Sequence, residues 1–455
     1  MKRALVAAVC ICMMGVAIAT AQNSSEHWVA TWGTAQNPAR IPAPARATQS
    51  TPAAPTPAPA TPAATTPPIP IAPEMAPKSS VVQRRYNLPP AVSEFNNQTL
   101  RQTLRTSIGG DAIRIRFYNA FGSPTLTLGA VHVALHAKDS EIVPSSDHAV
   151  TFSGKPGATI YAGQVLISDP LKMTVAPLAD LAVSLYLPSD TMAPTTHGLG
   201  LRSAYTSGPG DFTSAQTIDH PLSVSMAYYW LEGVDVLAPA DAAAIVTFGD
   251  SITDGDQSTP GIDAPWPSVL AARLQANKGT EHIAVVNEGI SGNRVLGDNG
   301  SGLSRFAHEA IEVPGVKWIT VLEGINDING ATRSLPPNTS FSADDLIAAY
   351  QQFIAAAHEH GIQVIGCTIT PEGGSSSYKD AGETIRVAAN DWIRAPGHFD
   401  AVVDFDKVMR NASDAKRFSD AAESPDLLHP GDAGYKMMGD AFDLKMFAGT
   451  TARGK

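Results

Sequence analysis

The hydrophobic residues of this chain follow two different sequence patterns, and the pattern changes near residue 242. Over about 98–237, apolar and polar side chains alternate in short runs that glycines and prolines separate. Alternation with a period of two predicts strands that bury one face, and many short strands with turn signals between them favour a β-sandwich. We therefore expect an all-β sandwich domain at 79–240. Its clearest strands are predicted at 112–117, 126–136, 181–187 and 230–237.

Beyond residue 242 the apolar runs become continuous and alternate with stretches of helical period. Uninterrupted apolar runs indicate strands buried on both faces, as in a parallel sheet that helices cover on its two sides. We expect such an α/β domain at 241–455. The runs lie at 243–248, 283–286, 318–322, 362–369 and 401–405, and helices are predicted at about 267–278, 343–360, 381–393 and 431–447. Because active sites of such sheets lie beyond the carboxyl ends of the strands, functional residues are expected directly after the runs.

The first 21 residues have the pattern of a secretory signal peptide. Lys2 and Arg3 precede an apolar run at 4–19, and the Ala-Thr-Ala sequence at 19–21 fits the small-residue cleavage pattern. The alternative, an uncleaved membrane anchor, would need a span of about 20 apolar residues, and this run is shorter. We expect cleavage at this point, a secreted or periplasmic mature protein, and no stable membrane insertion.

Two segments of very different composition come next. Residues 22–36 include Trp28 and Trp32 and are expected to form a short strand. Residues 37–78 consist mostly of proline, alanine and threonine, which cannot bury enough apolar surface to offset the entropy lost on ordering. We expect a disordered, extended tether there, which keeps many of the chain's 35 prolines outside any core.

The net charge limits the possible partners, and the positions of the cysteines limit the possible disulfides. The net charge of −11 disfavours binding to phosphate backbones, so nucleic acid is not an expected partner. Of the three cysteines, Cys10 and Cys12 lie in the signal segment, and Cys367 lies in the apolar run at 362–369. A single mature cysteine cannot form an intramolecular disulfide, and its position indicates a buried strand residue rather than a nucleophile.

Ser251 stands directly after the first apolar run of the α/β region, in the sequence Gly-Asp-Ser-Ile-Thr-Asp-Gly at 249–255. A serine at the turn from a strand into a helix is exposed above the sheet. Its own N–H points the same way, so nucleophile and oxyanion donor can share one residue. Gly249 removes a Cβ where the chain turns sharply. Taken alone, such a serine can also be a simple helix cap.

Two further runs lead into residues that could stabilise an oxyanion. Gly292 follows the run at 283–286 and offers an unobstructed backbone N–H. Asn326 follows the run at 318–322 and offers a side-chain amide. Each of them, taken alone, could be an ordinary turn residue.

Near the C-terminus, Asp426 and His429 are three residues apart, and Pro430 then opens the last predicted helix. A serine hydroxyl needs a base to act as a nucleophile. Histidine is the usual base, and a carboxylate fixes its tautomer and stabilises the imidazolium. Taken alone, either residue could merely cap the helix.

The four sites occur in the order Ser, Gly, Asn and Asp-x-x-His. Three of them follow predicted strands, and the fourth precedes the last predicted helix. This arrangement, which spans about 243–447, resembles the SGNH hydrolases, also called the GDSL esterase/lipase family. The resemblance implies a three-layer, flavodoxin-like fold for the α/β domain. It implies that Ser251 is the nucleophile, His429 the base and Asp426 its orienting partner. It also implies an oxyanion hole made by the N–H groups of Ser251 and Gly292 and by the side-chain amide of Asn326.

The stretches 28–32 and 97–102 also look like one branch of that family. It is similar to the esterases associated with xylanases in rumen bacteria, in which a β-rich domain precedes the hydrolase. The proline-rich insertion departs from that branch, and the packing partner of the two tryptophans stays open. The likeness implies a serine esterase that removes acyl groups, acetyl above all, from carbohydrates. The expected partner is thus an acylated carbohydrate or a small ester.

Several alternatives remain open at this point. The enzyme could be a lipase or short-chain arylesterase, or an acyltransferase in which a sugar hydroxyl replaces water. From a different class, the sandwich could be a glycan-binding module, although aromatic residues in strands usually face the core. The aromatic residues concerned are Tyr205, Tyr228, Tyr229 and Trp230.

The remaining motifs point to no cofactor. The sequence His-Glu-His at 358–360 places its histidines on different faces of a helix, and Asp254, Asp256 and Asp263 lack the twelve-residue pattern of a calcium loop. No phosphate-binding glycine-rich motif follows a predicted strand. We therefore expect neither a metal nor an organic cofactor.

Overall fold

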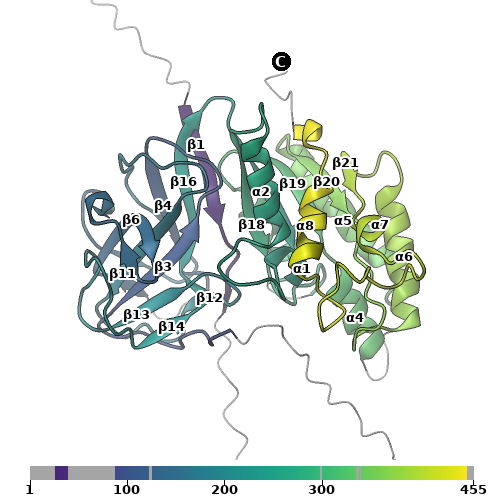
Figure 1. Ribbon diagram of the computed structural model, residues 1–455, viewed down its shortest axis with the longest axis horizontal. Helices are drawn as coiled ribbons and strands as arrows, with labels where there is room; N and C mark the ends of the chain where they lie inside the picture. Colours follow the sequence, from purple (N-terminus) through teal and green to yellow (C-terminus); the bar gives the residue numbers. More distant parts are fainter. Residues whose placement is uncertain are drawn as a thin grey trace, which may run out of the picture.

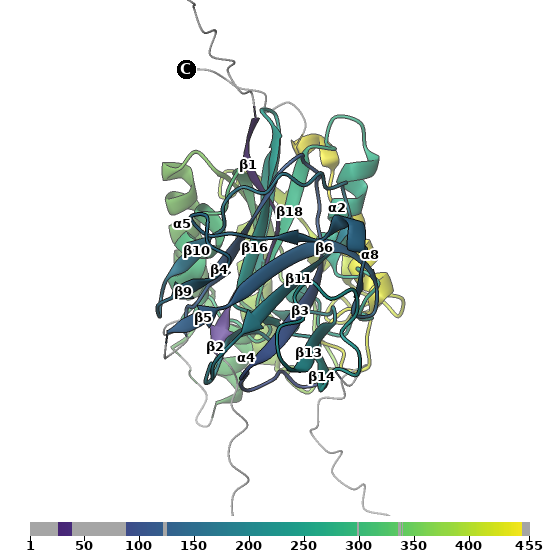
Figure 2. The same ribbon diagram turned by 90° about the vertical axis from the view of Figure 1, so that its left-hand side faces the viewer.

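The computed structural model describes residues 26–38, 88–121, 125–297, 300–334, 338 and 340–447. The predicted signal peptide at 1–21 and all of the predicted tether except Asn37 and Pro38 lie outside the described residues. Figure 1 shows two parts side by side, an all-β part and an α/β part that begins at β17 (Ala243–Gly249), and in Figure 2 the all-β part faces the viewer. No helix among the described residues combines the length and the apolar character needed to cross a bilayer.

Two antiparallel sheets dominate the all-β part. Their strands are β1 (Glu26–Gly33), β3 (Gln98–Arg105), β4 (Ile113–Tyr118), β6 (Ala130–Lys138), β7 (Glu141–Ile142), β8 (His148–Ala149), β10 (Val165–Ile167), β11 (Asp180–Leu187), β13 (Ala204–Pro209), β14 (Ser223–Ser225) and β16 (Leu231–Pro239). One sheet has the order β1-β16-β4-β10, and the other has the order β14-β13-β3-β11-β6-β7, with β8 paired to β6. Along β11, Leu181 and Val183 join the main hydrophobic core whereas Ala182 belongs to a separate small cluster, as expected for alternating strand residues.

Short elements complete this part. They are β2 (Asn37–Pro38), β12 (Thr195–His197) and β15 (Tyr228–Tyr229), which form one small sheet, β5 (Leu126–Leu128) and β9 (Ala158–Ile160), which form another, and a 3₁₀ turn at Pro144–Ser146.

The prediction of a single strand at 126–136 is wrong. This stretch consists of β5 and most of β6, and Gly129 separates them. A Cβ at Gly129 would lie 2.6 Å from the ring of Tyr186, so the chain passes this point only because it carries no side chain. The other strands predicted for this domain correspond to β4, β11 and β16.

The α/β part is built on five parallel strands. Besides β17, these are β18 (Ile283–Gly289), β19 (Val316–Leu322), β20 (Gln363–Cys367) and β21 (Ala401–Val403). Their order is β18-β17-β19-β20-β21. The helices are α1 (Ser251–Asp254), α2 (Trp266–Ala276), α3 (Gly302–Phe306) with a π-helical continuation at Ala307–Ile311, α4 (Ile325–Arg333), α5 (Ala343–Glu359), α6 (Asp380–Arg394), α7 (Phe405–Met409), α8 (Asp432–Asp440) and a 3₁₀ turn at Leu444–Phe447.

Helices cover both faces of this parallel sheet, as the sequence predicts. Ile245 of β17 shares one hydrophobic core with Trp266 of α2, whereas the adjacent Val246 shares the other core with Phe353 of α5. Helices α7 and α8 contribute to the same core as α2, and α3 and α6 contribute to the same core as α5. Alternate residues of each strand therefore serve two separate cores, which is why the runs are continuously apolar.

The last predicted helix, 431–447, is shorter than expected. Helix α8 ends at Asp440, and Phe442 then turns inward and stacks on Trp266 with 5.5 Å between the ring centroids. The carboxylate of Asp443 accepts the N–H of Lys445, which starts the separate 3₁₀ turn. Burial of one aromatic ring therefore outweighs the continuation of the helix.

Strand β1 lies at the seam between the two parts. It pairs antiparallel with β16 along its length. On its other side, Thr34 forms a parallel bridge with Asn287 of β18, and the N–H of Ala30 donates to the carbonyl of Pro314 at 2.9 Å. The N-terminal strand thus belongs to the sandwich and also contacts the edge of the parallel sheet.

The tryptophans of β1 pack against side chains of the sandwich. The guanidinium carbon of Arg114 lies 4.8 Å from the centre of the Trp28 ring. Tyr228 meets Trp32 edge to face, with ring centroids 4.8 Å apart. The question left open by the sequence is therefore answered in favour of the sandwich.

Candidate active site

The site begins where β17 gives way to α1. Asp250 caps this helix, because its carboxylate accepts the N–H of Ile252 at 2.9 Å, and Ser251 is the first helical residue. A Cβ at Gly249 would overlap the side chain of Thr253 and lie 2.8 Å from the carbonyl of Leu322 on the neighbouring strand. Glycine thus lets the strand end tightly enough to present Ser251 above the sheet.

His429 and Asp426 lie against this serine although they are far away in the sequence. Nε2 of His429 is 2.7 Å from Oγ of Ser251, and Nδ1 of His429 is 2.7 Å from Oδ2 of Asp426. Because a carboxylate can only accept, Nδ1 carries the ring hydrogen, and Nε2 of the neutral ring is left as an acceptor for the serine hydroxyl. The structure therefore brings together the three residues that the sequence singled out for nucleophile, base and orienting acid.

Asp426 is held firmly as an anion. Burial alone would raise the pKa of its carboxyl, but hydrogen bonds and the charge of His429 outweigh this and lower the pKa to about 2. Its other oxygen accepts from Ser424 Oγ and from the N–H groups of Leu428 and His429 at 2.9–3.0 Å. Burial would lower the pKa of His429, yet the contact with Asp426 and nearby carboxylates raise it above 6.5. The contact between Asp426 and His429 therefore stabilises the positively charged form of the His429 ring.

Gly292 and Asn326 come from the two strands that flank β17. In the sheet, Gly249 is level with Gly289 of β18 and with Leu322 of β19, so the loops that follow these three strands lie next to one another. Gly292 has a φ of 82° and stands in the exposed loop after β18. Asn326 lies in the first turn of α4, a helix that the sequence pattern did not reveal.

One hydrogen bond fixes the side chain of Asn326, and this bond uses only one of the two hydrogens on the amide nitrogen. Its Nδ2 donates to the carbonyl of Asn293 at 2.9 Å. An amide nitrogen carries two hydrogens, so the second remains to donate elsewhere. The loops after β18 and β19 are thereby tied to each other beside Ser251.

Arg305 of α3 connects the three loops through hydrogen bonds of its guanidinium group. The sequence did not predict this role. The five N–H groups of Arg305 reach five acceptors, namely Asn293 Oδ1 (3.0 Å), the carbonyl of Glu288 (2.7 Å), Glu309 (2.6 Å), the carbonyl of Gly249 (2.9 Å) and Glu323 (3.2 Å). Its guanidinium carbon also lies 3.9 Å from the centre of the Phe248 ring. A lone arginine between motifs has no spacing that would mark it, so no sequence signal pointed to this role.

Buried acids surround this arginine. Burial raises the pKa of Glu323 well above its usual value, and the neighbouring Asp250 adds to this effect while Arg305 opposes it. Burial also raises the pKa of Asp250 to about 7, although the N–H of Ile252 and the charges of His429 and Arg305 work in the opposite direction. Arg305 therefore supplies positive charge to both of these buried acids beneath the serine.

A second carboxylate, Asp254, holds the loop that contains Gly292. Its Oδ2 accepts both the N–H (2.8 Å) and the hydroxyl (2.7 Å) of Ser291, the residue directly before Gly292. Its Oδ1 is 3.0 Å from Nε2 of His197, which comes from β12 of the sandwich. The sequence offered Asp254 only as a weak calcium candidate, and it missed His197.

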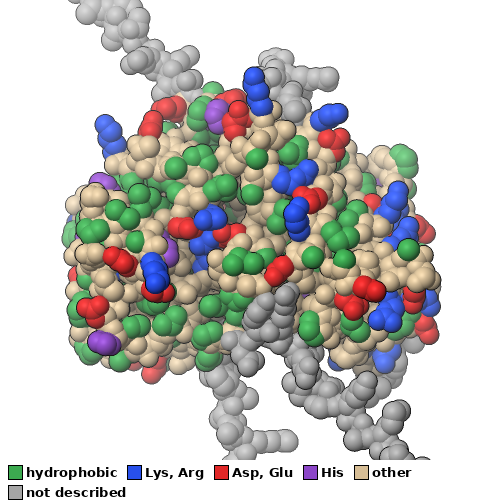
Figure 3. All heavy atoms as spheres, viewed as in Figure 1, with side chains coloured by type: hydrophobic (Ala, Val, Ile, Leu, Met, Phe, Trp, Pro, Cys, Tyr) green, Lys and Arg blue, Asp and Glu red, His purple; other side chains and the backbone are tan. Residues whose placement is uncertain are grey.

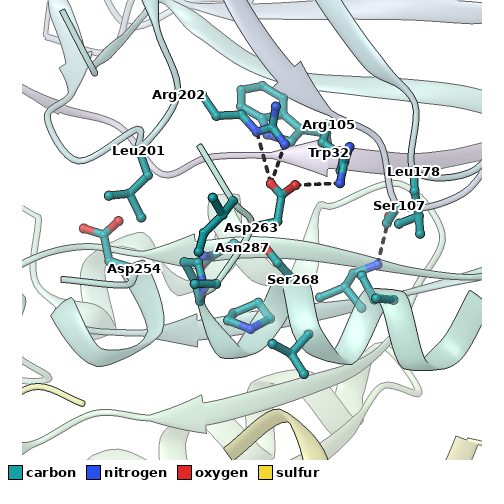
Figure 4. Close-up of a pocket in the computed structure, with 18 of the residues that line it drawn as sticks. Trp32, Arg105, Ser107, Leu178, Leu201, Arg202, Asp254, Asp263, Ser268 and Asn287 are labelled. Carbon is teal, nitrogen blue, oxygen red and sulfur yellow. Dashed lines mark hydrogen bonds and ion pairs between the residues drawn. The ribbon is translucent and has the colours of Figure 1, made fainter. Parts of the chain in front are cut away.

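The cavity shown in Figure 4 lies between the two parts, not around the serine. Its volume is about 640 Å³, and its walls include Trp32, Arg202, Asp254 and Asp263, but neither Ser251 nor His429. Asp263 pairs there with Arg105 (2.6 Å) and with Arg202, and both arginines also contact Asp180. The two ion pairs of Asp263 fasten the sandwich to the loop before α2.

The other residues that the sequence raised have structural partners. His358 contacts the carboxylate of Asp400 at 2.8 Å, and within the part of the chain that the structure describes no group of three or more metal-ligating side chains is found. Burial raises the pKa of the Cys367 thiol, which lies in β20. The four sandwich aromatics considered for glycan binding, Tyr205, Tyr228, Tyr229 and Trp230, are all buried.

The visible surface in Figure 3 mixes acidic, basic and hydrophobic side chains. No single class of side chain dominates that face. Exposed large apolar residues such as Tyr161, Leu222 and Ile262 occur on separate segments of the chain.

Comparison with known proteins identifies the α/β part. Residues 247–437 match the family of GDSL-like lipases and acylhydrolases. Solved structures similar to the chain include a variant of Axe2, an acetyl-xylooligosaccharide esterase from Geobacillus Stearmophilus, with 23% identity over 47% of this chain and 97% of that one, and a TM-score of 0.35. A lipase/acylhydrolase from Enterococcus faecalis has 22% identity, covers 46% of this chain and 99% of its own, and has a TM-score of 0.35. A GDSL-like lipase from Bacteroides thetaiotaomicron has 18% identity, covers 45% of this chain and 86% of its own, and has a TM-score of 0.33.

No curated protein matches the chain. The family match covers the end of the strand that precedes Ser251, the loops with Gly292 and Asn326, and the pair Asp426 and His429. Residues 247–437 therefore form a hydrolase domain of the GDSL-like lipase/acylhydrolase family.

Proposed function

We propose that this protein is a secreted serine esterase that hydrolyses acyl esters of carbohydrates, with acetyl as the first expected acyl group. The observation that carries the proposal is the unbroken hydrogen-bond chain from Ser251 through His429 to Asp426. This chain combines a nucleophile, a base aligned with its hydroxyl, and a carboxylate whose pKa stays near 2. Such an arrangement suits acyl transfer through a covalent intermediate.

The proposed reaction has two steps. In the first, His429 Nε2 accepts the proton of Ser251 while Oγ attacks the ester carbonyl, and the imidazolium then gives that proton to the departing alcohol. In the second, His429 accepts a proton from water, the hydroxide attacks the acyl-enzyme, and the carboxylic acid leaves as Ser251 regains its proton. Asp426 stabilises the imidazolium in both steps.

The oxyanion of each tetrahedral intermediate would be bound by three donors. They are the N–H groups of Ser251 and Gly292 and the free hydrogen of the Asn326 amide. The level register of the three strand ends and the hydrogen bond from Asn326 to Asn293 support this assignment. One such donor is typically worth about 3 kcal/mol of transition-state stabilisation.

The choice of a carbohydrate ester rests on less direct support. It follows from the resemblance of 28–32 and 97–102 to xylanase-associated esterases and from the signal-like first 21 residues. The buried aromatics of the sandwich give no support to a separate glycan-binding module.

An ester panel tests the proposal. We expect p-nitrophenyl acetate and acetylated xylan to be cleaved and long-chain p-nitrophenyl esters to be poor substrates. Ser251→Ala and His429→Ala should each lose at least about 1,000-fold in kcat. His282→Ala is the matched control, because His282 forms an exposed pair with Asp241 and should keep full activity.

Three outcomes would count against parts of the proposal. Full activity of Ser251→Ala would refute the mechanism. A preference for long-chain esters would indicate a lipase, and transfer of the acetyl group to an added sugar would indicate an acyltransferase.

A further inference from the structure

A chain of buried hydrogen bonds runs from the sandwich to the loop that carries Gly292. It starts at the carbonyl of Ala35, passes through His197 and Asp254, and ends at Ser291. His197 and Asp254 are both buried, with 4% and 5% of their surface exposed. This chain crosses the seam between the two parts of the molecule. It includes Asp254, the last residue of helix α1 and three residues after Ser251, and it ends at Ser291, the residue before Gly292.

The partners of His197 fix its protonation. Nδ1 lies 2.9 Å from the carbonyl of Ala35, and Nε2 lies 3.0 Å from the carboxylate of Asp254. The carbonyl of Ala35 and an ionised Asp254 carboxylate both accept hydrogen bonds, so this geometry favours a ring with hydrogen on both nitrogens, which is an imidazolium. Burial alone would lower the pKa of His197, but the charge of Asp254 and these hydrogen bonds raise it. Asp254 therefore has a buried cation as its partner.

Asp254 orients Ser291 through two bonds at once. One carboxylate oxygen accepts the N–H and the hydroxyl of Ser291, which fixes both the backbone nitrogen and the side chain on the same Cα. The peptide that follows this Cα contains the N–H of Gly292, so its direction is restricted as well. Asp254 is itself rigid, because its own N–H donates to the carbonyl of Asp250 at 2.9 Å within the turn that carries Ser251.

We propose that His197 is a positioning residue for the oxyanion hole, supplied by the β-sandwich and acting through Asp254 and Ser291 on the N–H of Gly292. This inference rests on the proposed esterase function. It gives the sandwich a part in the reaction without contact between the sandwich and the substrate. Without His197, the buried Asp254 carboxylate would keep the two donors of Ser291 but lose its cationic partner, and the loop would lose its anchor to the sandwich.

Substitution of His197 tests the inference with p-nitrophenyl acetate as the probe. His197→Leu removes both ring donors, and we expect kcat to fall about 10- to 100-fold while KM changes less than about threefold, because a displaced donor weakens transition-state binding. His197→Gln keeps an N–H donor near the position of Nε2, and we expect it to recover kcat to within about threefold of the wild type.

Arg202→Gln is the control for a general loosening of the seam. It removes the ion pair with Asp263 that joins the two parts and the ion pair with Asp180 within the sandwich, and Asp254 and Ser291 are not among the partners of Arg202. We expect its kcat to equal that of the wild type. If His197→Leu fails to fold, Ser291→Ala replaces it, because that variant loses only the hydroxyl bond to Asp254. Its kcat should then fall about 3- to 10-fold at unchanged KM.

The outcomes separate the inference from the proposed function. A wild-type protein that cleaves no ester would refute the function itself. An active wild type with a folded, fully active His197→Leu variant would refute the positioning role alone. Equal losses in His197→Leu, His197→Gln and Arg202→Gln would also refute it, since they would point to domain docking in general.

Discussion

Substitution of Arg305 by lysine probes the support beneath the active site. Arg305→Lys keeps the positive charge that Glu309 and Glu323 require, so the two carboxylates are not left without a cation. It reduces five N–H donors to three, and the five acceptors of Arg305 all lie in fixed positions around a planar guanidinium. At least two acceptors must therefore lose their partner.

The expected magnitude follows from this count. A buried acceptor without a partner costs about 1–3 kcal/mol, so two of them should lower the free energy of unfolding by about 2–6 kcal/mol. The stacking of the guanidinium on Phe248 is lost in addition. Because the carbonyl of Gly249 and the side chain of Asn293 are among the acceptors, the loops with Ser251 and Gly292 should shift. We expect kcat to fall about 10- to 100-fold.

Urea unfolding followed by fluorescence, together with ester kinetics on the folded protein, measures both effects. Arg273→Lys is a matched control, because Arg273 contacts the carbonyls of Gly439 and Phe442 and a lysine can satisfy both. It should cost less than about 1 kcal/mol. The reasoning is refuted if Arg305→Lys unfolds within about 1 kcal/mol of the wild type and keeps its kcat.

Three further predictions concern the catalytic chain and its packing. Asp426→Asn should lower kcat by about three to four orders of magnitude at nearly constant KM, because the ring of His429 loses the acceptor that fixes its tautomer; a loss below tenfold would contradict this. In the wild type, kcat/KM should rise with pH through a midpoint above 6.5, because His429 must be neutral to act as base and its pKa is raised; a profile from pH 5 to 9 with a midpoint below 6.5 would be inconsistent. Gly289→Ala should lower both stability and kcat, because its Cβ would lie within 2.8 Å of backbone atoms of Thr253 and Asp254, whereas Gly208→Ala meets no atom within 4 Å and should be neutral in thermal unfolding and kinetics.

Much of the fold could be predicted because each α/β strand is buried on both faces and each sandwich strand on one. The pattern failed where local geometry decided the outcome. Gly129 divides one apolar stretch into two strands, and Phe442 leaves the helix to reach Trp266. Neither event changes the hydrophobic pattern along the chain, so neither could be read from it.

The residues of the site also fall into two groups, those that the sequence predicted and those that it did not. Ser251, Asp426 and His429 stand in short motifs at the ends of predicted elements, and the structure brings them into hydrogen-bond contact. Arg305 and His197 stand in no motif. Their importance comes from acceptors that are distant in sequence, and only the packed fold brings these acceptors together. The partners of an isolated polar residue cannot be inferred from its own position in the chain.

Strand β1 occupies its place as a bound peptide would, although it is part of the same chain. It fills the seam between β16 and β18, while residues 39–87 join the adjoining β2 to the rest of the molecule. These residues form the covalent connection between the two. A single cut within it would make the docking of β1 a reaction between two molecules, and dilution alone could then release the strand.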